Sequence, residues 1–191
     1  MLTMKISSLI ILIGAIIFLI AALLPISRVF GLKTAKERLD FINQSKTAWN
    51  LSQVLFASGA IIFAVGVSLS AFLLKERQPG NILLIAATFL IIGALAWCRH
   101  VYLRAKNPMA YANGLLPGWH FLIYILLALA AMLIIGIALL MMNFPAWSGW
   151  LLIVSAILFF TTYILARDLP PVLIYLPGLV LAFILFFELR N

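Results

Sequence analysis

The sequence predicts an all-α polytopic membrane helix bundle with six transmembrane helices. Of its 191 residues, 66% are hydrophobic and 9% are charged, whereas soluble domains are about 45–50% apolar and about 25% charged. The apolar residues fall in six segments bounded by charged residues, Pro, Gly or Trp. Because six spans of about 20 residues use roughly 120 residues, we expect one transmembrane domain over residues 1–191 and no appended soluble domain.

The boundaries of the six spans follow from the turns between them. Pro79-Gly80 separates the second span from the third, Asn143-Phe144-Pro145 separates the fourth from the fifth, and Arg167 to Pro171 separates the fifth from the sixth. The third span is short for a hydrocarbon core of about 30 Å, so we expect its helix to continue through Cys98 and Arg99. The predicted spans are residues 6–26, 53–74, 81–98, 119–142, 147–166 and 172–187.

The segment 34–49 is predicted to form a short amphipathic cytoplasmic helix before the second span. Thr34 and Glu37 have the spacing of a capping box. Apolar residues then recur at helical spacing, with Lys, Arg, Asp and Asn between them. Such a helix rests on the membrane interface or leads directly into the second span.

All five tryptophans fall at predicted helix ends, where amphipathic rings favour the level of the lipid headgroups. They are Trp49, Trp97, Trp119, Trp147 and Trp150.

The distribution of Lys and Arg predicts the orientation in the membrane. One side of the predicted topology carries nine of them: Arg28, Lys33, Lys36, Arg38, Lys46, Arg99, Arg104, Lys106 and Arg167. The other side carries four: Lys5, Lys75, Arg77 and Arg190. The positive-inside rule therefore places loops 28–50 and 99–118 in the cytoplasm, with both termini outside.

We interpret the net charge of +8 as an orientation signal and as a means of contacting membrane lipids, which include anionic ones. We do not interpret it as a sign of a nucleic-acid partner.

The predicted spans contain none of the ionisable residues on which intramembrane chemistry usually depends. Every Asp, Glu, Lys and Arg lies at or beyond a predicted helix end. Cys98 is the single cysteine, and His100 and His120 are the two histidines, without a carboxylate beside either. We therefore predict no metal site, no cofactor and no catalytic residue.

The best candidate site is the cytoplasmic end of the bundle, where basic and hydrogen-bonding residues flank several spans. Converging helix ends would form a basic mouth suited to a phosphate or carboxylate headgroup. The competing interpretation is ordinary interfacial snorkelling, with Arg167 and Asp168 neutralising each other. The candidate residues are Arg99, His100, Arg104, His120, Arg167, Asp168, Trp49 and Gln53.

A second candidate region lies deeper, around Tyr163, Tyr175 and Pro177. A proline inside a span frees a backbone carbonyl and allows a kink. The kink is either a structural bend or one wall of a cavity, and both interpretations stay open at this point.

Three C-terminal segments resemble a pattern found in uncharacterised bacterial membrane proteins of about six helices. They are Pro145-Ala146-Trp147-Ser148-Gly149-Trp150, Asp168-Leu169-Pro170-Pro171 and Tyr175-Leu176-Pro177. The resemblance covers roughly the last 50 residues. It implies a bacterial cytoplasmic membrane and brings no activity with it.

These observations together predict a non-enzymatic integral membrane protein. It would be a partner subunit of another membrane protein, or a binder of lipid or a small amphiphile at its cytoplasmic mouth. One alternative is a small transporter or substrate-binding transporter component, with a cavity beside Tyr163, Tyr175 and Pro177. A second alternative is a membrane enzyme with a site near His100 and His120.

Overall fold

The computed structural model describes residues 2–76, 80–142 and 144–187, and every regular element within these ranges is a helix. The predicted helical bundle is therefore confirmed. Five of the helices are long and apolar enough to cross a membrane, and α8 is a shorter apolar helix. The elements are α1 (Leu2–Leu23), η1 (Pro25–Gly31), α2 (Ala35–Gln44), α3 (Lys46–Leu74), α4 (Gly80–Lys106), α5 (Pro108–Ala112), α6 (Trp119–Met141), α7 (Ala146–Ala166) and α8 (Val172–Phe187).

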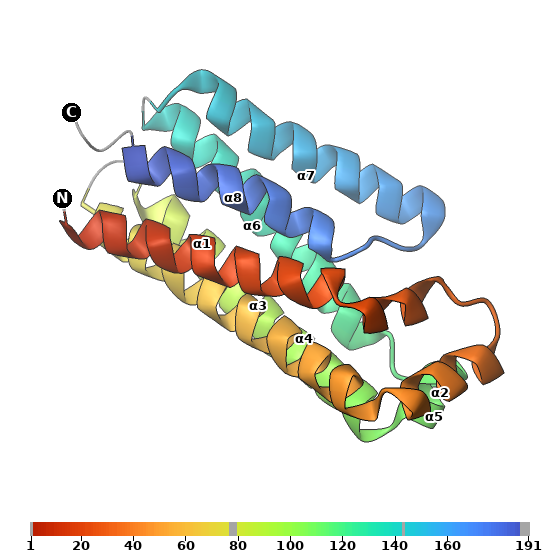
Figure 1. Ribbon diagram of the computed structural model, residues 1–191. Helices are drawn as coiled ribbons and strands as arrows, with labels where there is room; N and C mark the ends of the chain where they lie inside the picture. Colours follow the sequence, from red (N-terminus) through yellow and green to blue (C-terminus); the bar gives the residue numbers. More distant parts are fainter. Residues whose placement is uncertain (1, 77–79, 143, 188–191) are drawn as a thin grey trace.

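The long helices pack in a closed ring that follows the order of the chain (Figure 1). Each of α1, α3, α4, α6 and α7 contacts the next, and α8 closes the ring between α7 and α1. Within this ring α7 packs mainly against α6, and α8 packs mainly against α1. The interior of the ring is therefore bounded by six helices.

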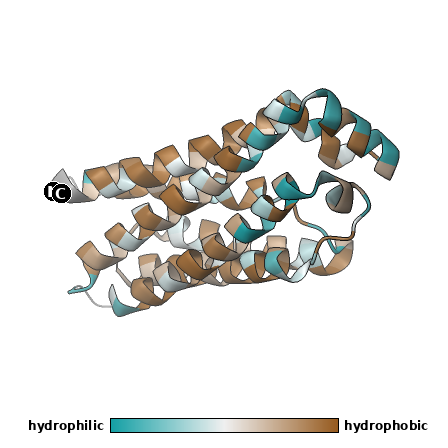
Figure 2. Cartoon of the chain, turned by 90° about the horizontal axis from the view of Figure 1, so that it is seen from below, coloured by the Kyte–Doolittle hydropathy of each residue, from teal (hydrophilic) through white to brown (hydrophobic). Residues whose placement is uncertain are grey.

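The two ends of the bundle differ in composition. The start of α1 and the end of α8 lie together at one end (Figure 1). The short helices η1, α2 and α5 lie at the other end, which we call the short-helix end. Hydrophilic residues gather at the short-helix end, whereas the long helices are apolar along most of their length (Figure 2).

Helix α1 ends three residues before the predicted limit at residue 26, because Pro25 interrupts it. A proline disfavours helical dihedrals in the residue before it, and Leu24 has φ −57° and ψ 143°. Pro25 then begins the 3₁₀ helix η1, in which Ile26 and Val29 are buried. The chain thus turns across the short-helix end rather than running on as one helix.

The predicted helix 34–49 is present as two helices. The capping box is confirmed: the Glu37 N–H donates to Thr34 Oγ1 over 3.2 Å, and the Thr34 N–H donates to Glu37 Oε2 over 3.1 Å. The prediction of one continuous helix is wrong, since Ser45 has φ −134° and ψ 42° and separates α2 from α3. This break folds α2 back so that Ile42 and Trp49 share one buried cluster with Ile26 and Val29.

Helix α4 continues about two turns beyond the predicted limit at residue 98 and ends at Lys106. Helix α3 likewise begins at Lys46, before the predicted start at residue 53. Trp97 therefore lies inside α4 rather than at its end, and both Trp49 and Trp97 face the interior, where they are 0% and 1% exposed. The Trp97 indole N–H donates to the Phe56 carbonyl over 3.2 Å. The other three tryptophans are exposed at the beginnings of α6 and α7.

Helices α1 and α3 approach each other closely at glycines. A Cβ on Gly59 would lie 2.7 Å from the backbone nitrogen of Phe18, and a Cβ on Gly14 would overlap the backbone nitrogen of Phe63. Further along the same contact, Ser70 Oγ donates to Ser7 Oγ over 2.9 Å. Small residues allow this backbone-to-backbone packing between apolar helices, and Gly136 and Gly149 provide the corresponding contact between α6 and α7.

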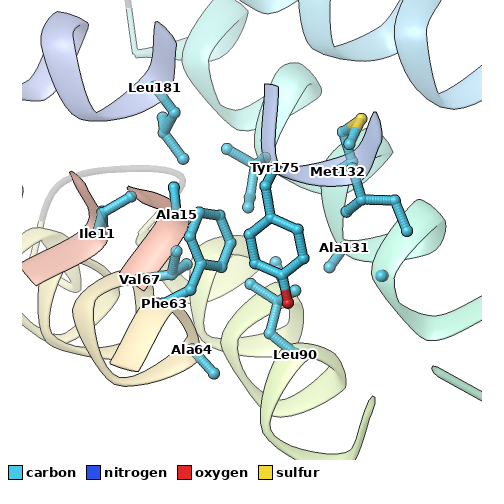
Figure 3. Close-up of a cluster of buried hydrophobic side chains, with 14 of the residues drawn as sticks. Ile11, Ala15, Phe63, Ala64, Val67, Leu90, Ala131, Met132, Tyr175 and Leu181 are labelled. Carbon is cyan, nitrogen blue, oxygen red and sulfur yellow. The ribbon is translucent and has the colours of Figure 1, made fainter. Parts of the chain in front are cut away.

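Aromatic side chains fill the middle of the ring. Phe18 stacks on Tyr175 with ring centroids 3.9 Å apart, and Phe63 meets Tyr175 edge-on at 5.1 Å. Figure 3 shows Phe63 and Tyr175 side by side, among aliphatic side chains from α1, α3, α4, α6 and α8. The helix α8 thus reaches across to α1 and α3 through Tyr175.

Replacing Gly59 by Ala is expected to destabilise the bundle. The added methyl group has no space beside the backbone of Phe18, and overpacking of this kind costs about 1–3 kcal/mol. For a chain of this size each kcal/mol lowers the melting temperature by about 2–4 °C. Thermal unfolding in detergent measures the shift.

The matched control for this substitution is Gly93→Ala. Gly93 is also a buried helical glycine, but its nearest neighbours lie 3.6 Å from an added Cβ, which is ordinary contact. Gly93→Ala is expected to leave the melting temperature unchanged or to raise it slightly, because Ala favours the helix over Gly. Equal shifts for the two variants would contradict the close contact at Gly59.

Candidate functional site

A cavity of about 410 Å³ opens at the short-helix end of the ring. Its volume is in the range of ligand pockets, about 300–1,000 Å³. Nearly every element of this end contributes a wall, as do the inner faces of α3, α4 and α6. The lining residues are Ala22, Ser27, Phe30, Arg38, Phe56, Trp97, Arg104, Tyr111, Phe121, Asp168, Pro170, Pro171 and Val172.

Arg104 reaches the cavity from the last turns of α4 and is surrounded by aromatic rings. The centre of its guanidinium lies 5.3 Å from the Phe30 and Trp97 ring centroids and 5.4 Å from that of Tyr111. Its Nε is buried and has no hydrogen-bond partner among the described residues. A buried donor without a partner is costly, and a charged one more so. The Arg104 guanidinium can therefore bind an anion, to which its unpartnered Nε–H would donate a hydrogen bond.

Arg38 brings a second positive charge to the same cavity, from α2. Its Nε donates to the Leu32 carbonyl over 2.9 Å, and one terminal nitrogen donates to the Ala112 carbonyl over 3.5 Å. These two bonds join α2 to the linker before it and to the end of α5. Because a guanidinium has five N–H donors, Arg38 can hold the short helices together and still donate to a ligand.

Asp168 lines the cavity from the connection between α7 and α8 and is exposed. Within the described ranges it has no Lys or Arg nitrogen within 4.0 Å. Its neighbour Arg167 is exposed, has φ 52° in the left-handed region and ends α7. Arg167 is not among the lining residues of the cavity. The structure therefore brings together Arg104 and Asp168 from the predicted mouth, but not Arg167.

Trp49 and Gln53 lie behind the cavity wall rather than in it. The Trp49 ring packs against Tyr111 at 5.1 Å and against Phe30 at 6.2 Å, and both of these rings face the cavity. Gln53 is buried one turn further along α3, where its amide nitrogen donates to Ser52 Oγ over 3.0 Å. Trp49 thus supports the aromatic wall that holds Arg104.

Burial raises the pKa of the Tyr111 phenol above its ordinary value, although the nearby Arg104 and Arg38 oppose this. Tyr111 therefore stays neutral at physiological pH. It offers the cavity a hydroxyl group and an aromatic face but no charge.

The two histidines are buried outside the lining of the cavity. His100 is buried on α4, with its ring 5.7 Å from each of the Trp97 and Phe121 rings, and His120 on α6 stacks on Trp119 at 3.6 Å. Each has a buried Nδ1 without a partner among the described residues. No cluster of three or more His, Cys, Asp or Glu able to hold a metal ion occurs in the described ranges.

Arg99 points away from the cavity. It is exposed on α4 and lies over the Tyr102 ring, with 5.6 Å between the guanidinium centre and the ring centroid. The predicted mouth thus divides into residues that line the cavity, residues that support its wall, and Arg99 and Arg167, which do neither.

Below the cavity the middle of the ring around Tyr175 is filled, whereas a separate apolar space of about 260 Å³ lies between α6 and α7. The Tyr124 and Tyr175 hydroxyls are joined by a hydrogen bond of 3.2 Å, and Pro177 is buried in α8. Tyr163 is half-buried on α7 at the edge of the core. Two small cavities beside Tyr175 and Gly178 measure about 10 and 20 Å³. Spaces of this size hold a water molecule at most.

Sequence reasoning missed Arg38, Tyr111, Phe30 and Phe121 as parts of the site. Arg38 belongs to the charged face of the predicted amphipathic helix, which is typically exposed to solvent. Tyr111 lies in a loop for which no helix was predicted. An available signal was the concentration of Phe30, Arg104 and Tyr111 close to the predicted helix ends.

Comparison with family models, curated proteins and solved structures finds no match to this chain.

Replacing Arg38 by Ala is expected to loosen α2 and α5 by removing both backbone contacts of its guanidinium. Hydrogen bonds from charged groups contribute about 1.5–3 kcal/mol each, so amide hydrogen exchange over residues 32–45 and 108–112 should become faster. Hydrogen-exchange mass spectrometry measures this. Lys36→Ala, on the exposed side of the same helix, is the control and should leave exchange unchanged. Slow exchange in Arg38→Ala would show that other contacts hold the short helices.

Proposed function

We propose that this chain is an integral membrane protein that binds an amphiphile in the cavity at its short-helix end. Five described helices have the length and composition of membrane spans, and α8, which closes the ring, would be the sixth. Apolar side chains are exposed along the outer faces of these helices, as is favourable against lipid. In the described ranges, helices satisfy their backbone groups internally, as a membrane requires.

The observation that carries the binding proposal is the state of Arg104. It is a cation held among three aromatic rings at a cavity, with a buried Nε that lacks a partner and no carboxylate at ion-pair distance in the described chain. An anionic headgroup would supply both the charge and the hydrogen-bond acceptor. The apolar part of the ligand would then lie against Phe56, Phe121 and Val172, which line the same cavity.

Binding is favoured over catalysis because the side chains that converge here recognise anions. Guanidinium groups and aromatic faces dominate the lining, whereas neither His100 nor His120 is part of it. The other functions expected from the sequence, a partner subunit, a small transporter and a membrane enzyme, stay predictions. For transport, the packed interior below the cavity would have to open.

The orientation we propose places the short-helix end in the cytoplasm of a bacterial inner membrane, with both termini outside. The nine basic residues on the cytoplasmic side of the predicted topology belong to η1, α2, the beginning of α3, the end of α4 and the connections at this end. Their number supports this orientation through the positive-inside rule.

Replacing Arg104 by Gln is expected to reduce the amount of amphiphile that stays bound. Loss of a hydrogen bond to a charged group costs about 1.5–3 kcal/mol, which corresponds to a fall in affinity of about tenfold or more. Native mass spectrometry of protein gently extracted from its own membrane measures the fraction carrying a bound ligand.

Arg99→Gln is the matched control. Arg99 lies less than two turns from Arg104 on the same helix and carries the same charge, but it is outside the cavity. We expect this variant to retain ligand as the wild type does. Equal retention by Arg104→Gln and the wild type would rule out Arg104 as the anion-binding group. Equal losses in both variants would point to general charge attraction at the membrane surface instead.

The proposed orientation can be tested with single cysteines in a Cys98→Ala background. Lys36→Cys on α2 should react in intact cells only with a membrane-permeant maleimide, whereas Lys75→Cys at the end of α3 should also react with an impermeant one, given access to the outer face. Both lysines are exposed. The reverse labelling pattern would invert the topology, and identical labelling of both positions would argue against a membrane-spanning bundle.

A further inference from the structure

The cavity carries charges of both signs that are not paired with each other. Arg104 and Arg38 reach it from α4 and α2, and Asp168 reaches it from the connection before α8. Neither arginine lies within 4.0 Å of the Asp168 carboxylate. A ligand in the cavity can therefore meet positive groups on one side and a carboxylate on another.

The charges favour a headgroup that is itself zwitterionic. A phosphodiester carries one negative charge and matches the donors of a guanidinium. A headgroup that ends in glycerol would leave Asp168 without a cation. A phosphate monoester would bring a second negative charge to a cavity that already contains a carboxylate, which is unfavourable. An ammonium group attached to the phosphodiester would satisfy Asp168.

The same residues distinguish a primary ammonium from a quaternary one. Quaternary ammonium groups are typically held by aromatic cages, but the rings of Phe30, Trp97 and Tyr111 here surround the guanidinium of Arg104. An exposed carboxylate such as that of Asp168 instead accepts hydrogen bonds, which a primary ammonium can donate from three N–H groups and a quaternary one cannot.

We infer that the cavity selects a phosphodiester bearing a primary ammonium group, with the phosphate at Arg104 and Arg38 and the ammonium at Asp168. This inference rests on the amphiphile binding proposed above. In a membrane the ligand of this chemistry would be a phosphatidylethanolamine-type lipid. Soluble glycerophosphoethanolamine, which is also a phosphodiester, has the same phosphate and ammonium groups without the apolar part.

The test compares headgroups with the apolar part held constant. Purified, delipidated protein is incubated with an equimolar mixture of dioctanoyl phosphatidylethanolamine, phosphatidylglycerol and phosphatidylcholine, and native mass spectrometry measures how much of each stays bound. The wild type is expected to favour the ethanolamine lipid by about two- to five-fold, as a solvent-exposed ion pair allows. Asp168→Asn should lose this preference while binding a similar total amount of lipid.

Asp40→Asn is the matched control. Asp40 is an exposed carboxylate on α2 that is absent from the cavity lining, so the variant should keep the wild-type preference. No headgroup preference in the wild type, or an unchanged preference in Asp168→Asn, would overturn the inference and leave amphiphile binding intact. Absence of bound lipid from the wild type, with no effect of Arg104→Gln, would overturn the proposed function itself.

A further arm adds free glycerophosphoethanolamine to the lipid-bound protein. Displacement of the lipid only at concentrations far above that of the lipid would support an amphiphile as the ligand. Displacement at equal concentration would keep the recognition of the phosphate and ammonium groups but overturn the need for an apolar part. Failure of glycerophosphoethanolamine to compete at any concentration, together with equal binding of all three lipids, would show that the apolar part alone is recognised and would overturn the inference.

Discussion

The close contact between α1 and α3 is the constraint on which the rest of the structure depends. Because Gly14 and Gly59 have no side chains, the two backbones touch, and the residues one turn further along each helix, Phe18 and Phe63, turn towards the middle of the ring. Both rings meet Tyr175, which ties α8 to this pair of helices. The ring closes through this aromatic contact. Any separation of α1 from α3 would remove the partners of Tyr175 and open the floor beneath the cavity.

The cavity exists because helices of unequal length end at different levels. Helix α4 continues past Trp97 to Lys106, whereas α1 ends at Leu23 and α8 begins only at Val172. The short helices cross the gap without filling it, which leaves a polar space above the Trp97 ring. A guanidinium placed there is attracted to the surrounding ring faces but is still short of an acceptor. Its environment is favourable for a cation and incomplete without an anion, and this is the physical basis of the binding we propose.

The capping box at Thr34 could be predicted because its cause is local, since it depends on residues three positions apart. The end of α1 before Pro25 is equally local, but the predicted span continued past this proline to residue 26. The position of Trp97 could not be predicted in the same way. Its neighbours in sequence mark a helix end, yet packing against α3 and α6 makes continuation of the helix favourable and buries the ring. The break at Ser45 has a similar origin, because the burial of Ile42 beside η1 offsets the cost of interrupting the helix between α2 and α3. Tertiary contacts thus decided where the helices of this end begin and stop.

By itself the sequence determined the all-helical class, the approximate limits of the apolar helices and the gathering of basic residues at one end, because each depends on composition and on spacing along the chain. Only the tertiary structure decided which charged residues share a space. Arg99 and Arg104 lie on the same helix and look alike in sequence, yet one faces outwards over Tyr102 and the other faces the cavity. Arg38 and Asp168 are far apart in the chain and meet at that cavity through the folding of α2 and the closing of the ring by α8. The physical reason is that helical periodicity fixes which residues share a face of a helix, whereas only packing against the neighbouring helices decides which face points towards the cavity.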